Sequence, residues 1–109
     1  MLIDLRTYTV KPNTLKTHLE LYEKMGKATQ TKHLGQPLAF LKGESGNPNE
    51  YVHIWVYKDA ADRETKRAAM WGDPNWIRYT QESAKLGALI SQHNKLMNPV
   101  DFFSEPTSG

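Results

Sequence analysis

The chain of 109 residues has no cysteine, which excludes disulfides, thiolate-held zinc or iron–sulfur centres, and thiol nucleophiles. No run of about 18 apolar residues is present, so the sequence predicts no membrane span. The opening Met-Leu-Ile-Asp-Leu-Arg lacks the basic stretch and following apolar run of a signal peptide. We therefore expect a cytoplasmic protein.

Charge of one sign is also scarce. Fourteen lysines and arginines face twelve acids, a net charge of +2, and the basic residues are scattered. This balance argues against a nucleic-acid-binding surface. The four histidines show no His-Glu-x-x-His or His-x-x-x-His spacing, and glycine-rich phosphate loops and the Gly-x-Ser-x-Gly elbow are absent, so we predict no metal and no cofactor.

What is present is the composition of one small globular domain, with 39% hydrophobic and 24% charged residues. We assign residues 1–103 to this domain and residues 104–109, which are small and polar, to a flexible tail. Residue patterns predict strands over 2–10, 38–43, 50–58 and 89–97, and helices over 12–34, 59–71 and 73–86. The alternation in 89–97 is poor, and a continued helix is the alternative there.

Turn and cap residues support these boundaries. Gly35 and Pro37 end the first helix, and the turn-rich segment 43–49 joins two strands into a hairpin. Asp59 and Asp73-Pro74 are typical of helix starts. The order β-α-β-β-α-(α)-β predicts an α+β fold of the ferredoxin-like type, a four-stranded antiparallel sheet with its helices on one face.

Side-chain alternation then divides the first and third strands into two faces. We expect the aliphatic face to lie under the helices, namely Ile3, Leu5, Val52, Ile54 and Val56. The open face would then carry Arg6, Tyr8, Tyr51, His53, Trp55 and Tyr57. So many exposed rings need a cover. A ligand or a second copy of the chain would supply it, and a symmetric homodimer is the commonest oligomer.

The chain resembles the NIPSNAP family over about residues 2–100. The resemblance rests on segments in one order and spacing: Asp4-Leu5-Arg6-Thr7-Tyr8, His33-Leu34-Gly35, Val52-His53-Ile54-Trp55-Val56-Tyr57, Ala61-Asp62-Arg63-Glu64, Arg67-Ala68-Ala69-Met70, Asp73-Pro74-Asn75-Trp76 and Gln92-His93-Asn94-Lys95-Leu96-Met97-Asn98-Pro99. It implies a ferredoxin-like subunit and a homodimeric α+β barrel. It implies no reaction, although related barrels include cofactor-independent monooxygenases, haem-degrading enzymes and small isomerases, a fold-level analogy.

The most informative cluster is His53, Trp55 and Tyr57, at alternate positions of one strand. His53 is the candidate general base, since histidine titrates near neutral pH. Trp55 and Tyr57 are candidate stacking platforms for a flat ligand. The alternative is that these rings fill the core of the barrel and His53 is hydrogen-bonded inside it.

Arg6 and Tyr8 on the neighbouring strand are candidate anchors for an anionic or carbonyl-bearing ligand. The alternative is a structural pair between Asp4 and Arg6. Asn94 would complete a trio with His53 and Trp55, if its strand turns it to the same face. His18 and His33 are predicted to be structural, and the charged run over 62–67 is predicted to be a solvated helix face.

Together these residues predict a cavity for a small aromatic or polyketide-like molecule in a homodimeric barrel. By analogy with the related barrels, the reaction would be that of a cofactor-independent monooxygenase or isomerase. The first alternative is a non-catalytic dimerisation or interaction module with a packed interior. The second is a binder of haem or another small ligand.

Overall fold

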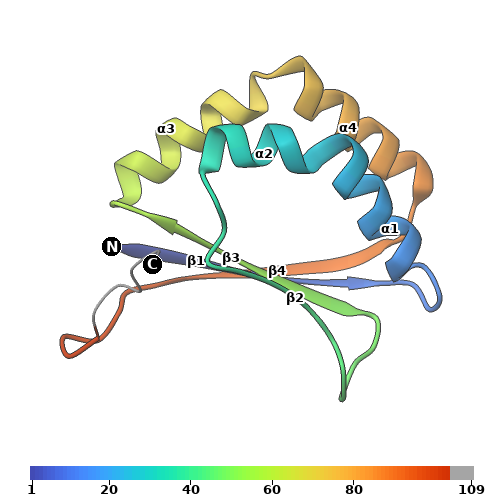
Figure 1. Ribbon diagram of the computed structural model, residues 1–109, viewed down its shortest axis with the longest axis horizontal. Coiled ribbons are helices and arrows are strands. Elements are labelled where there is room, and N and C mark those ends of the chain that lie inside the picture. Colours follow the sequence, from blue (N-terminus) through green and yellow to red (C-terminus); the bar gives the residue numbers. More distant parts are fainter. Residues whose placement is uncertain (104–109) are drawn as a thin grey trace.

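The computed structural model describes residues 1–103; the tail predicted over 104–109 lies outside them. Figure 1 shows a curved sheet with the helices arched over one face. The strands are β1 (Leu2–Val10), β2 (Ala39–Lys42), β3 (Glu50–Tyr57) and β4 (Leu89–Met97). The helices are α1 (Leu15–Leu21), the π-helical turn η1 (Tyr22–Gly26), α2 (Lys27–Leu34), α3 (Ala60–Trp71) and α4 (Pro74–Leu86). Of these helices, none has the length and apolar character that crossing a bilayer requires.

The sheet has the strand order β2-β3-β1-β4, and all three pairings are antiparallel. This topology confirms the predicted ferredoxin-like α+β fold, including a strand rather than a helix over 89–97. β1 is central, and its register sets Arg6 opposite His53 on one side and opposite Asn94 on the other. The middle of the sheet therefore brings candidate site residues from three strands together.

The predicted caps begin and end the later helices. The Asp59 carboxylate accepts a hydrogen bond from the backbone N–H of Asp62 at 2.8 Å. The Asp73 carboxylate accepts from Asn75 N–H at 2.9 Å, with Pro74 in the first helical turn. Gly87, at φ 66°, ends α4 in the left-handed conformation that glycine adopts without strain.

The helix predicted over 12–34 begins at Leu15 and is interrupted by a wider π turn, η1. Gly26 ends this turn against α4, where a Cβ atom would lie 3.0 Å from the Tyr79 ring. Glycine therefore permits a close approach of the two elements. π turns are frequent at functional sites, and here the turn carries Tyr22, whose hydroxyl donates a 2.6 Å hydrogen bond to Gln30 Oε1.

The predicted assignment of the two sheet faces is wrong. Trp55 and Tyr57 are 0% and 1% exposed beneath the helices, on the same face as Asp4 and Arg6. The residues predicted to lie under the helices, Ile3, Leu5, Val52, Ile54 and Val56, point to the helix-free face instead and are half-buried. Both faces of β3 are apolar, so alternation separates them without ranking them. The larger rings lie under the helices because they remove more apolar area from water there.

Candidate functional site

A cavity of about 390 Å³ lies between the sheet and the helices. Residues of all four strands and of α1, η1, α2, α3 and α4 contribute to its walls. Its volume lies within the range of small-molecule sites, roughly 300–1,000 Å³. The interior of this subunit is therefore hollow beside the aromatic face of the sheet.

Parallel aromatic rings form one wall of the cavity. The rings of Tyr8 and Tyr51, opposite each other on β1 and β3, are stacked with centroids 4.8 Å apart and planes 5° from parallel. Phe40 of β2 continues the stack at 5.9 Å from Tyr51 and 8° from parallel. Because Tyr51 has a stacked ring on each side, the wall offers mainly ring edges to the cavity, and a flat, unsaturated ligand can pack on such edges in the edge-to-face arrangement.

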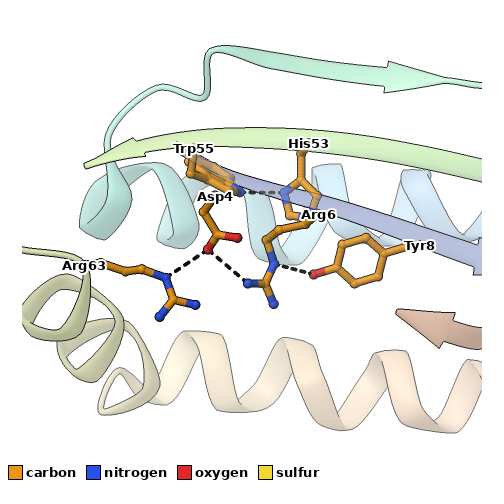
Figure 2. A network of polar contacts seen from close by, with 6 residues as sticks. All are labelled: Asp4, Arg6, Tyr8, His53, Trp55 and Arg63. Carbon is orange, nitrogen blue, oxygen red and sulfur yellow. Dashed lines mark hydrogen bonds and ion pairs between the residues drawn. The ribbon is translucent and has the colours of Figure 1, made fainter. Parts of the chain in front are cut away.

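His53 lies beside this wall and is 4% exposed. Its Nδ1 atom accepts a 2.7 Å hydrogen bond from the Trp55 indole N–H (Figure 2). An indole nitrogen only donates, so Nδ1 carries no proton and Nε2 carries the N–H. Burial, assisted by the positive charges of Arg6 and Arg67, lowers the pKa of His53 to about 3. At neutral pH His53 is therefore a hydrogen-bond donor through Nε2, which has no partner within residues 1–103.

Asp4 gathers two guanidinium groups under the cavity. Its side chain is fully buried, and Oδ2 lies 3.2 Å from Arg6 Nη1 and 3.1 Å from Arg63 Nε (Figure 2). Arg6 Nε also donates to the Tyr8 hydroxyl at 3.0 Å. The structural pairing of Asp4 with Arg6 is thus present, and it holds the Arg6 side chain in place at the cavity wall.

Arg67 also lines the cavity, one helical turn after Arg63 on α3. It forms no ion pair with any acidic residue in the described part of the chain. Arg67 was not among the predicted site residues, because segment 62–67 was assigned to a solvated face. The spacing of Arg63 and Arg67 was the available signal, because residues four apart share one side of a helix.

His18 was predicted to be structural, yet it lines the cavity from α1. Its Nε2 lies 2.7 Å from the Tyr51 hydroxyl oxygen, in a hydrogen bond whose direction depends on the tautomer. Burial lowers the pKa of His18 and raises the pKa of Tyr51, so both groups are neutral at pH 7. This pair places a second imidazole at the aromatic wall.

The structure brings only part of the predicted site together. Arg6, Tyr8 and His53 line the cavity. Trp55 and Tyr57 share their face but lie deeper, packed in a buried cluster with Met70 and Leu34. Both are therefore placed behind the cavity wall, and the Trp55 N–H is used by His53.

Asn94 lies opposite Arg6 in the β1–β4 register, but it is exposed and outside the cavity lining. Gln92, two residues earlier on the same face of β4, lines the cavity instead. The structure therefore does not assemble the trio of Asn94, Trp55 and His53 around one ligand position.

The described residues offer no ready metal centre. Residues 1–103 contain no cluster of three or more histidines and acids arranged around a common point. Asp73, the N-cap residue of α4, pairs with a histidine and not with a metal-binding cluster: His33 Nε2 lies 2.8 Å from Asp73 Oδ2. Haem ligation through His53 does not fit, because an axial imidazole needs a free nitrogen lone pair and Nδ1 is occupied.

Solved structures with this architecture include two NIPSNAP proteins. A NIPSNAP family protein with unknown function from Agrobacterium tumefaciens is 32% identical, over 94% of this chain and 91% of that one, at a TM-score of 0.86. An uncharacterized NIPSNAP domain protein from Burkholderia xenovorans is 25% identical, over 96% and 100%, at 0.89.

An antibiotic biosynthesis monooxygenase is 22% identical over 92% of this chain and 99% of that one, at a TM-score of 0.63, a likeness of fold alone. No curated protein matches the chain. The family described as NIPSNAP matches residues 3–104. The chain therefore belongs to the NIPSNAP family.

Proposed function

We propose that this protein binds a small planar aromatic molecule in the cavity between its sheet and its helices. The observation that carries the proposal is the stack of Tyr8, Tyr51 and Phe40 along a cavity of about 390 Å³. A flat ring system placed in the cavity would bury its apolar faces between this wall and the helices that cover the sheet. The same volume argues against a packed interior, the alternative of a purely structural module.

We further propose that the protein acts on this molecule without a cofactor, as an isomerase or a monooxygenase. In such a reaction an oxygen atom of the substrate would gain negative charge. The Nε2–H of His53 is suited to stabilise such an oxygen, since it is held in place by Trp55 and shielded from water. This assigns His53 the role of a donor rather than that of a general base. The proton that leaves the substrate would pass to the neutral His18 imidazole through Tyr51.

We also propose that two copies of the chain pair through the helix-free face of the sheet. That face carries Ile3 and Leu5 of β1 and the three aliphatic side chains of β3. Leu41 and Met97, which are 55% and 49% exposed, continue it. An apolar face of this extent on an isolated subunit favours a partner surface of the same kind.

The proposed ligand site is tested by filling the cavity. Ser83 lines it from α4, whereas Gln81 on the same helix is exposed and outside it. Saturation-transfer NMR with a library of planar aromatic fragments should detect binders of the wild type and of Gln81→Phe. The same binders should be lost with Ser83→Phe, whose circular dichroism and melting temperature check that it folds. Equal binding by both variants, or no binder of the wild type, contradicts the proposal.

A further inference from the structure

We infer that the molecule bound in the cavity carries a delocalised oxyanion, a carboxylate or a phenolate, and that Arg67 binds it. This inference rests on the proposed ligand site and adds the charge and chemistry of the ligand. It is carried by the Arg67 guanidinium, which lines the cavity and has no acidic partner among the described residues, and by two ring nitrogens of lining residues, His53 Nε2 and Trp76 Nε1, which have no hydrogen-bond partner there.

The charge balance around the cavity is positive. Three arginines lie at or beside the cavity: Arg6, Arg63 and Arg67. Among the described residues, Asp4 is the one carboxylate that pairs with any of them, and it already pairs with both Arg6 and Arg63. With Arg67, three guanidinium groups stand against one carboxylate, an excess of two positive charges. No aspartate or glutamate occurs among the described residues that line the cavity. A half-buried cation without a counter-ion is unfavourable, and an anionic ligand would relieve it.

The neutral groups point to the same chemistry. His53 Nε2 is a donor because Trp55 occupies Nδ1, and the indole nitrogen of Trp76 is a donor in any state. Both nitrogens are inaccessible to solvent and unpaired in the described structure, although buried donors are normally hydrogen-bonded. A ligand that moves in between these side chains and supplies acceptor lone pairs would satisfy them.

An oxyanion would both balance the positive charge and accept hydrogen bonds from the donors. A carboxylate or phenolate oxygen accepts several hydrogen bonds, and guanidinium binds such oxygens through charge-assisted contacts, in pairs when the group is a carboxylate. An uncharged acceptor that reached the ring nitrogens would satisfy them but leave the positive charge unbalanced. The ring wall of Tyr8 and Tyr51 then holds the flat part of the same molecule.

The test uses probes matched in shape and different in charge. At pH 8 the carboxylate pair is 2-naphthoate and 2-naphthamide, and the phenolate pair is 4-nitrophenolate and 4-nitroanisole. Dissociation constants are measured by calorimetry or tryptophan fluorescence for the wild type, Arg67→Gln and Arg78→Gln. Arg78 is the matched control, since it lies on the exposed side of α4 and bonds only to Asn75 among the described residues.

We expect at least one anion to bind the wild type about tenfold or more tightly than its neutral partner, a difference typical of one charge-assisted contact. Arg67→Gln should abolish that preference while the neutral probe still binds, and Arg78→Gln should keep it. The pair that shows the preference tells a carboxylate from a phenolate. Equal binding within both pairs, or an unchanged preference in Arg67→Gln, overturns this inference alone. Failure of all four probes to bind the wild type overturns the ligand site as well.

Discussion

The indole N–H of Trp55 donates a 2.7 Å hydrogen bond to Nδ1 of His53, two residues earlier on the same strand. The bond fixes the tautomer of a buried imidazole and turns its Nε2–H away from the tryptophan. The sequence pattern suggested that His53 is a base and Trp55 a stacking platform. In the structure His53 is a hydrogen-bond donor, and Trp55 holds it in place.

Trp55→Phe should release the tautomer of His53, because the ring that replaces the indole has no N–H. In ¹⁵N spectra of the imidazoles, the wild type should show His53 protonated at Nε2 only, and the variant should show a mixture of both tautomers. The lost bond and the smaller ring should lower the free energy of unfolding by roughly 2–4 kcal/mol. Trp71→Phe, at an exposed position, should leave the His53 signals unchanged.

Stability should fall as the pH falls below neutral. The pKa of His53 is about 3 in the folded protein against 6.5 in an unfolded chain, so the unfolded state binds the proton first. Its contribution is complete above pH 6.5 and is lost as the pH falls toward 3. Between pH 7.5 and 5 this single group should remove about 2 kcal/mol from the free energy of unfolding. Urea denaturation at both pH values measures the loss, to which His18 adds in the same direction.

The matched variants for this effect are His53→Gln and His93→Gln. His93 lies exposed on β4, and its replacement is the control. His53→Gln should be less stable at pH 7.5 but should lose about 2 kcal/mol less on going to pH 5. Parallel pH profiles for the wild type and His53→Gln would contradict a depressed pKa.

Asp4→Asn should strongly destabilise the fold, because it leaves the guanidinium groups of Arg6 and Arg63 without their shared counter-charge. Breaking a buried pair in this way typically costs about 3–5 kcal/mol. Adding Arg63→Gln to Asp4→Asn should recover part of this loss, since one uncompensated charge is removed. Urea denaturation of the single and double variants measures both effects, and a loss below about 1 kcal/mol for Asp4→Asn would exclude the buried network.

The proposed dimer gives a separate prediction. Ile54 lies on the helix-free face of β3, where a charge would sit in the interface. Ile54→Asp should therefore shift the mass measured by light scattering from dimer toward monomer. Ile77→Asp, at an exposed position on α4, should leave the mass unchanged. A wild type that is monomeric at tens of micromolar protein would contradict the pairing.

The fold could be predicted from the sequence because its signals are local. The caps at Asp59 and Asp73, the stop at Gly87 and the alternation of 50–58 each specify an element from a few neighbouring residues. Element order then selects the topology. The π turn at Tyr22–Gly26 has no such local mark, and its last residue, Gly26, packs against Tyr79, far along the chain.

The site was predicted only in part, for a related reason. Alternation grouped Arg6, Tyr8 and His53 correctly but could not say which face the helices cover, since both faces of β3 are apolar. Depth within a face is also invisible in sequence, so Trp55 and Tyr57 were expected at the cavity and lie behind it. His18 and Arg67 reach the cavity from helices whose docking depends on the whole fold.

The measurement that tests the account most directly is an amide NMR titration of the wild-type protein and Ser83→Phe with the probe that binds most tightly. We expect saturable changes in amide chemical shift that are largest at Tyr51, His53 and Thr80. Residues of β4 whose side chains point away from the cavity should show no change, and Ser83→Phe should show none of these changes. Shift changes confined to the helix-free face of the sheet, or identical changes in both proteins, would show that the cavity is not the binding site.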